Sequence, residues 1–175
     1  MAKKSSILKF EIISTIFIMI VGTLLHFTFE WFNNNPLVGT FSAVNESTWE
    51  HLKLLFFPML ISTIIGFFYK GKDIPNYLFA KMLGIILAMS FVVIFFYTYV
   101  GIIGRNFAFL DIGSFFIAVI LGQYLSYKKM QSESSCNNVI PIIILIVLCL
   151  CFIVFTFFPP NIALFKDPIT GKFGI

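Results

Sequence analysis

The sequence predicts an all-α integral membrane protein, a bundle of five transmembrane helices forming a single domain over residues 1–175. Three observations predict this fold class. Of the 175 residues, 59% are hydrophobic and only 11% are charged, whereas a soluble domain has about 25% charged residues. The hydrophobic residues gather in five runs of membrane-spanning length, and polar breaks separate these runs. Such a chain could not cover a soluble surface, so the lipid bilayer is its expected solvent and partner.

The first hydrophobic run, residues 12–29, is expected to lie in a transmembrane helix covering residues 10–31. At a rise of about 1.5 Å per residue, a run of this length crosses most of the hydrocarbon core. Lys3, Lys4 and Lys9 precede the run, as basic residues precede the hydrophobic segment of a signal peptide. Because the run is long for such a segment and no small-residue cleavage site follows it, we expect an uncleaved span.

Four further spans are expected, separated by turn-rich breaks. They cover residues 48–69, 77–103, 107–127 and 139–158, and a tail of residues 159–175 follows them. The break between the third and fourth spans, GRN, is short and predicts a tight helical hairpin. Pro58 lies inside the second span, where it removes one backbone hydrogen bond and clashes with the carbonyl of Leu54. We therefore expect the helix to bend there and to turn that carbonyl towards the bundle interior.

The lysine distribution predicts the orientation of the spans, because cytoplasmic loops carry an excess of Lys and Arg. With the N-terminus inside, the cytoplasmic segments hold eight basic residues and the opposite face holds four: Lys3, Lys4, Lys9, Lys70, Lys72, Lys81, Lys128 and Lys129 against Lys53, Arg105, Lys166 and Lys172. We therefore expect a cytoplasmic N-terminus and an extracytoplasmic C-terminus. The net charge of +4 is dispersed over these positions, so no nucleic-acid partner is expected.

The tail carries residues that form turns. Asp167-Pro168 precedes Thr170-Gly171, which combines a proline that fixes φ, an aspartate that can accept from its own backbone and a glycine. We expect the tail to fold as a flap on the outer face instead of extending freely into solvent.

Ionisable residues collect at the outer ends of the first two spans. His26 and Glu30 share one face of the first helix, because they are four residues apart. The others open the second span or lie near the hairpin: Glu46, Glu50, His51, Lys53, Arg105 and Asp111. Ionisable groups at membrane depth cost a few kcal/mol or more and indicate a functional site by default, less strongly near helix ends.

These residues supply the candidate site. The candidate catalytic residues are Glu46, Glu50 and His51, the candidate ligand-binding residues are Asn45, Lys53, Arg105 and Asp111, and the candidate metal ligands are His26, Glu30 and His51. Imidazole and carboxylate donors suit a divalent metal such as Zn²⁺ or Mn²⁺, although no HExxH motif and no third histidine are present. We expect the two histidines with Glu30, Glu46 and Glu50 to converge in one pocket beneath the loop of residues 33–47 and the tail.

Each of these residues also has a purely structural interpretation. Ser47 and Glu50 have the spacing of a capping box, in which each side chain bonds the amide of the other residue. Lys53 could pair with Glu50 one turn away, and Asp111 could pair with Arg105 across the hairpin. Convergence is expected even without function, because charged groups at this depth contact each other in preference to lipid.

Several strings in the chain are not explained by membrane composition. They are Asn35-Pro36-Leu37, Asn45-Glu46-Ser47, Glu50-His51-Leu52-Lys53, and Pro159-Pro160 through Asp167-Pro168 to Thr170-Gly171 and Gly174-Ile175. With these strings, the chain resembles over its whole length a family of small bacterial integral membrane proteins of unknown function. The resemblance implies a multi-pass protein of the bacterial plasma membrane and brings no established activity.

Three functions remain open. The first is a membrane-embedded enzyme that uses a divalent metal for hydrolysis or group transfer on a lipid or small-molecule ligand at the outer face. The second is a carrier or channel subunit, which would need an oligomer because polar residues do not continue through the membrane. The third is a non-catalytic binding or assembly partner whose outer cluster is a structural polar network.

The predicted orientation can be tested by cysteine labelling of intact cells with a membrane-impermeant reagent. In a cysteine-free background, Thr170→Cys should be labelled from outside and Ser132→Cys should react only after permeabilisation, because the lysine bias puts these positions on opposite faces. The reverse labelling pattern would contradict the orientation.

Overall fold

A computed structural model describes residues 2–132 and 136–175 of the chain. Five of its helices are long and apolar enough to cross a membrane. They are α1 (Ala2–Trp31), α3 (Thr48–Tyr69), α4 (Tyr77–Ile103), α5 (Ala108–Met130) and α6 (Val139–Phe157), joined by the short helices α2 (Pro36–Gly39), η1 (Gly71–Asp73) and η2 (Ala163–Phe165). The described residues contain one isolated β-bridge and no named strand. The predicted all-α class with five spanning helices is confirmed.

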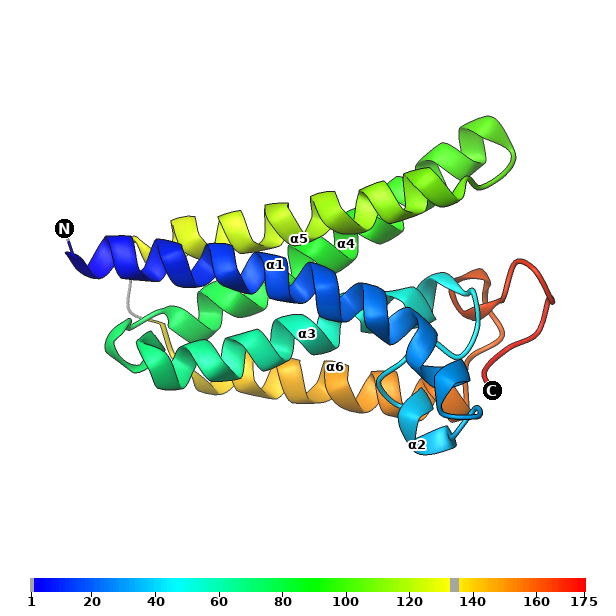
Figure 1. The fold of residues 1–175 in the computed structure, drawn as a ribbon, viewed down its shortest axis with the longest axis horizontal. Helices are drawn as coiled ribbons and strands as arrows, with labels where there is room; N and C mark the ends of the chain where they lie inside the picture. The colour runs from blue at the N-terminus through cyan, green and yellow to red at the C-terminus, as the bar shows by residue number, and fades with distance from the viewer. Residues whose placement is uncertain (1, 133–135) are drawn as a thin grey trace.

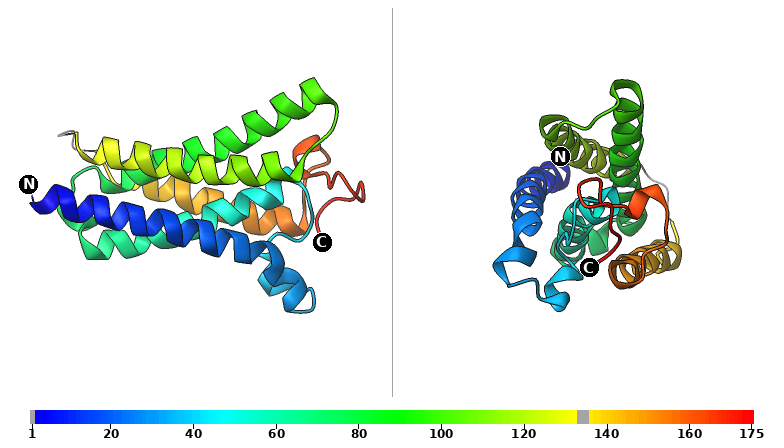
Figure 2. Two further views of the ribbon diagram at one scale, coloured as in Figure 1. Left: turned by 45° about the horizontal axis from the view of Figure 1, so that its top comes forward. Right: turned by 90° about the vertical axis from the view of Figure 1, so that its right-hand side faces the viewer.

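The five long helices run side by side along the length of the molecule, and the two termini lie at its opposite ends (Figure 1). Helix α3 lies in the middle of the bundle and contacts α1, α4 and α6 (Figure 2). The predicted hairpin of α4 and α5 is confirmed, and Gly104 ends α4 in the left-handed conformation with φ 82° that glycine adopts readily. The loop end of this hairpin diverges from the rest of the bundle (Figure 1).

Aromatic side chains fill the core where α3 meets α6. Phe152 of α6 is fully buried, and its ring centroid lies 4.5 Å from that of Trp49 and 4.9 Å from that of Phe56. Aromatic pairs at these separations add about 0.5–1.5 kcal/mol each beyond the area they bury. The core therefore fixes α6 against the first half of α3, the half that carries the ionisable residues.

Helices α1 and α3 approach each other closely at Gly22. A Cβ atom on Gly22 would lie 2.4 Å from the carbonyl oxygen of Leu54 and 2.6 Å from Cζ of Phe115. Pro58 cannot donate to that carbonyl, and the oxygen faces α1 instead. The expected exposure of the Leu54 carbonyl to the bundle interior is confirmed, whereas the bend at Pro58 stays a prediction. Small residues at such crossings let helix backbones pack in membranes.

A buried ion pair joins α1 to α4 at the N-terminal end of the bundle. Nζ of Lys81 lies 2.6 Å from Oε2 of Glu11 and 3.4 Å from Oε1 of Gln123, and all three side chains are buried. Lys81, assigned from sequence to the cytoplasmic segments, is thus enclosed among three helices. Two atoms of this cluster, Oε1 of Glu11 and Nε2 of Gln123, have no hydrogen-bond partner in the described part of the chain.

The close approach at Gly22 predicts that Gly22→Ala will destabilise the protein. The added Cβ meets backbone that cannot move aside cheaply, so we expect a loss of about 1–3 kcal/mol. Gly101→Ala is the matched control, because a Cβ there meets nothing within 4 Å and Ala favours helix over Gly. Thermal unfolding in detergent measures both variants, and equal midpoints would contradict the prediction.

Candidate metal centre

Three ionisable side chains come together where α1 ends and α3 begins. Nε2 of His26 lies 3.8 Å from Oε1 of Glu46, and Nε2 of His51 lies 3.4 Å from Oε2 of the same carboxylate. The two imidazole rings are 5.2 Å apart between centroids. Each residue offers one ligand atom, and these atoms all lie within 4.8 Å of one another. This group contains two of the three predicted metal ligands and one of the predicted catalytic carboxylates.

The three residues reach the site from different elements. His26 projects from α1 about one turn before the helix ends, and His51 belongs to the first turn of α3. Glu46 lies in the loop between α2 and α3, where its neighbour Asn45 holds the backbone. Oδ1 of Asn45 accepts from the Ser47 amide at 2.9 Å, and its Nδ2 donates to the carbonyl of Gly174 at 2.9 Å. Asn45, predicted to bind a ligand, thus fixes the loop that carries Glu46.

The hydrogen bonds of His51 determine its tautomer. Its Nδ1 lies 2.9 Å from the backbone carbonyl of Ser47, which can only accept, so Nδ1 carries the proton. In the neutral imidazole, Nε2 then presents a lone pair towards the carboxylate of Glu46. Two acceptors that face each other at 3.4 Å are joined by a cation or a proton between them. A divalent metal ion is one group that can take this position.

Glu50 and Lys53 form a buried ion pair on the other side of the same helical turn. Nζ of Lys53 lies 2.5 Å from Oε2 of Glu50, and 0% and 2% of the two side chains are exposed. The ammonium also donates to the carbonyls of Gly39 at 2.8 Å and Ser42 at 3.4 Å, and to the hydroxyl of Thr156. The predicted pairing of these residues is confirmed. Neither side chain is free to meet a ligand in this arrangement.

The predicted capping box is only half correct. Ser47 accepts from the Glu50 amide at 3.3 Å, as expected. The reciprocal bond is wrong, because the Glu50 carboxylate accepts from the amide of Val44 at 3.1 Å and the Ser47 amide donates to Asn45. The ammonium of Lys53 draws the carboxylate towards the loop interior and away from the backbone of Ser47.

The remaining candidates lie outside the three-residue group. Glu30 is exposed at the end of α1. Arg105 lies over the ring of Phe107, with its Cζ 4.7 Å from the centroid, and Asp111 accepts from the hydroxyl of Tyr99. Within the described residues no ion pair joins Arg105 to Asp111, so that expectation is wrong. Both residues belong to the diverging end of the α4–α5 hairpin.

The tail is folded, as predicted. Oδ1 and Oδ2 of Asp167 accept from the amide of Ile169 at 2.8 Å and from the hydroxyl of Thr170 at 2.6 Å. Burial raises the pKa of the Asp167 carboxyl, but these hydrogen bonds and the nearby His51 outweigh burial and lower the pKa. The ring of Phe165 packs on Trp49 at 4.7 Å between centroids. The tail therefore covers the start of α3 beside the site.

Hydroxyl groups in the loop and in α6 were missed from the sequence. The Ser42 hydroxyl accepts from the Phe29 amide at 3.1 Å and donates to the carbonyl of Leu25 at 2.5 Å, which ties the loop to α1. Thr156 binds the Lys53 ammonium from α6. A threonine within an apolar run was a signal for the second contact, but no pattern in the sequence indicates the first.

These features define the class of protein: an all-α protein with five helices that could span a membrane and a polar cluster at one end of the bundle. The chain belongs to a family of unknown function, DUF6512, whose model matches residues 1–175. The expected membership of a family of unknown function over the whole chain is confirmed. No curated protein and no solved structure matches the chain.

The buried ion pair predicts a large difference between single and double substitutions. Lys53→Met leaves the Glu50 charge buried and unpaired, so we expect a loss of about 3–5 kcal/mol in unfolding free energy. Glu50→Gln with Lys53→Met removes both charges and should recover most of that loss. Chemical denaturation in detergent measures the series, with the exposed Lys172→Met as control. A single variant as stable as the double variant would contradict a charge-pairing role.

Proposed function

We propose that the protein binds a divalent metal ion through His26, Glu46 and His51 at the extracytoplasmic face of a bacterial plasma membrane. We further propose that it uses the metal in hydrolysis or group transfer on a lipid or small molecule. One observation carries the proposal: His26, Glu46 and His51 each offer one ligand atom, and these atoms all lie within 4.8 Å of one another.

The donor set supports a metal that keeps an open position. Two histidines and one carboxylate are a ligand set of catalytic zinc sites, where water or substrate occupies the fourth position. Ligand atoms of a tetrahedral zinc site lie about 3.4 Å apart. His51 lies at this distance from Oε2 of Glu46, whereas His26 lies 3.8 Å from the other oxygen, Oε1, and the three ligand atoms spread over up to 4.8 Å. The side chains must therefore move closer together around a bound ion. All three side chains are partly exposed, between 30% and 43%, which leaves access for a ligand.

The residues around the site have distinct parts in this proposal. A bound zinc ion lowers the pKa of a water ligand to about 7 and polarises carbonyl or phosphoryl oxygens. The Ser47 carbonyl holds the ring of His51 in the tautomer that leaves Nε2 free. Glu50 is engaged by Lys53, so Glu46 is the carboxylate that remains for metal ligation or proton transfer.

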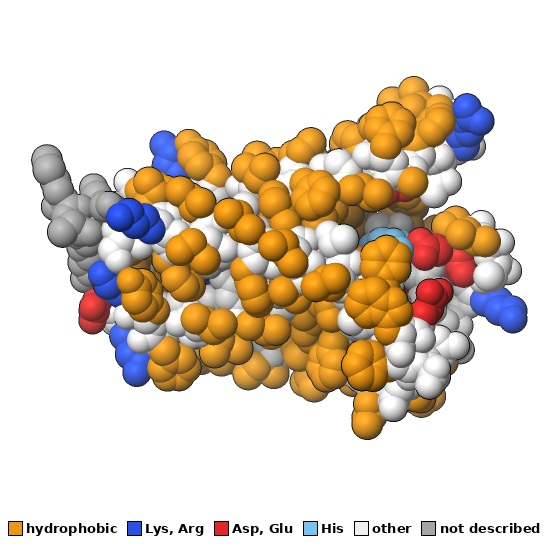
Figure 3. Space-filling view, viewed as in Figure 1, with side chains coloured by type: hydrophobic (Ala, Val, Ile, Leu, Met, Phe, Trp, Pro, Cys, Tyr) orange, Lys and Arg blue, Asp and Glu red, His pale blue; other side chains and the backbone are white. Residues whose placement is uncertain are grey.

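The assignment to the extracytoplasmic face rests on the lysine bias. The space-filling view shows more Lys and Arg surface at the N-terminal end of the bundle than at the other end, where the carboxylates near the histidines gather (Figure 3). By the positive-inside rule, the histidine end faces outwards. A carrier would need polar groups along a path through the whole bilayer. The apolar core around Ile18, Leu55 and Phe56 interrupts such a path.

The proposal predicts about one divalent metal ion per chain in the purified protein. Zn²⁺ titration with calorimetric detection should show binding that His26→Ala, Glu46→Ala and His51→Ala each weaken by more than about tenfold, since even outer-shell partners change affinity by this amount. Glu30→Ala is the matched control, because this exposed carboxylate follows His26 by one turn of α1.

Two results would contradict the metal proposal. The first is wild-type protein that binds no Zn²⁺, Mn²⁺ or Co²⁺. The second is a Glu46→Ala variant that binds metal as tightly as Glu30→Ala does, which would show that the carboxylate between the histidines is not a ligand.

A further inference from the structure

The depth of His26 places the candidate site at the level of lipid headgroups. The apolar run of α1, residues 12–29, is about 27 Å long at 1.5 Å per residue, close to the hydrocarbon core of about 30 Å. His26 precedes the end of this run by three residues, which is about 4.5 Å along the axis. In a membrane-spanning orientation its ring therefore lies near the boundary between hydrocarbon and headgroups.

An exposed aromatic wall adjoins His26 on α1. The rings of Phe27 and Trp31 stack with centroids 5.9 Å apart, and these residues are 43% and 61% exposed. Phe27 also contacts the edge of His26 at 5.0 Å between centroids. Tryptophan at this depth is typical of the membrane interface, so the wall faces lipid and not the bundle interior.

The opposite wall of the site is polar. Glu46 is 43% exposed, and the tail residue Asp167 lies near enough to His51 to be influenced by its charge. In the space-filling view the histidine surface lies between the hydrophobic surface of the bundle and a group of carboxylates (Figure 3). A ligand reaching the histidines therefore meets apolar surface on one side and polar surface on the other.

The helices around the site cover α1 at the level of Gly22 and leave it uncovered at the level of His26. Gly22 lies one turn before His26 on the same face of α1 and is covered by Phe115 of α5. Beyond this contact the end of the α4–α5 hairpin diverges from the rest of the bundle (Figure 1), and the space-filling view shows a hollow between this end and the histidine surface (Figure 3). The hollow opens sideways, at the depth where a membrane lipid carries its ester and phosphate groups.

We propose that the ligand of this site is a membrane lipid that enters sideways from the outer leaflet. Its oxygen-bearing headgroup region reaches His26, Glu46 and His51, and its chain lies along Phe27 and Trp31. The inference rests on the proposed metal site and specifies which of its two ligand classes is used. Carboxylate, ester and phosphate oxygens are suitable for the remaining position on the metal.

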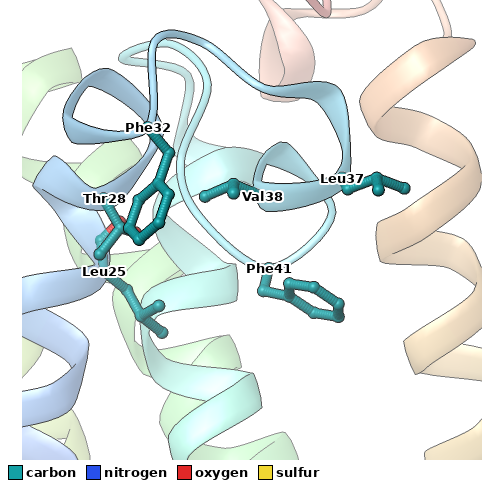
Figure 4. A pocket seen from close by; sticks show the side chains of 6 residues that line it. All are labelled: Leu25, Thr28, Phe32, Leu37, Val38 and Phe41. Carbon is teal, nitrogen blue, oxygen red and sulfur yellow. The ribbon is translucent and has the colours of Figure 1, made fainter.

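A second apolar feature serves as a control for this proposal. A cavity of about 300 Å³ lies on another face of α1, lined by Leu25, Thr28, Phe32, Leu37, Val38 and Phe41 (Figure 4). Leu25, Thr28 and Phe32 follow helical spacing along one stripe, and His26 lies outside it. Phe41 is 49% exposed, comparable to Phe27, so Phe41→Ala removes a similar apolar group away from the histidines.

The experiment uses Co²⁺-loaded protein in phosphatidylcholine nanodiscs, since the visible spectrum of Co²⁺ reports its ligands. Hydroxamates bind such metals, so acetohydroxamate and dodecanohydroxamate are titrated as a soluble and an amphiphilic probe. We expect dodecanohydroxamate to change the spectrum at far lower concentration. Phe27→Ala with Trp31→Ala should weaken that probe by about tenfold, because the chain loses apolar contact area, and leave acetohydroxamate unchanged. Phe41→Ala should change neither.

The outcomes separate this inference from the proposed function. Wild-type protein that gives no Co²⁺ spectrum contradicts the metal site and the lipid ligand together. A Co²⁺ spectrum that responds equally to both probes, or a chain-length preference that survives Phe27→Ala with Trp31→Ala, overturns the lipid ligand and leaves the metal site standing. Retained Co²⁺ binding shows that the double variant is folded, and Phe27→Leu with Trp31→Leu should restore part of the preference.

Discussion

The Lys53 ammonium is the contact on which the polar end of the molecule depends. It is fully buried and binds Glu50 on its own helix, the carbonyls of Gly39 and Ser42 in the loop, and Thr156 on α6. A buried ammonium without partners costs several kcal/mol, so the Lys53 charge stabilises the arrangement that keeps these four groups together. The loop that delivers Glu46 is held in place by this requirement.

The distribution of burial separates supporting residues from candidate ligands. Glu50 and Lys53 are almost completely buried and paired, whereas the three side chains of the candidate metal centre remain partly open. A polar network built only for stability would be expected to satisfy its members internally. Here Nδ1 of His26 is buried with no partner among the described residues, and two acceptors face each other beside it. The Glu11–Lys81–Gln123 cluster is also incompletely paired, but its side chains are buried. The histidine group differs from both networks because it combines incomplete pairing with side chains that are partly exposed.

Hydropathy was sufficient to predict the five helices, because a bilayer demands long apolar segments. The sequence places His26 and His51 at nearly the same depth in the membrane, and this was sufficient to predict that the two residues approach each other. The sequence did not show that Glu50 turns inwards, because that depends on loop carbonyls and on a threonine 103 residues away from Lys53. Lys81 was assigned to a cytoplasmic segment by its charge alone, and its partner Glu11 lies on another helix. Whether charged and polar side chains on distant helices pair with each other depends on how the helices pack. Packing of this kind leaves no local pattern in the sequence.

The order in which the polar end can be assembled follows from the spacing of its contacts along the chain. Lys53 has a partner three residues away in Glu50, so its charge can be compensated while α3 enters the bilayer. The contacts with Thr156 and between Asn45 and Gly174 span 103 and 129 residues. They form only after the later helices are in place, since long loops must close first. The charge of Lys53 can therefore be compensated locally, whereas the contacts that complete the surroundings of the candidate site need the whole chain.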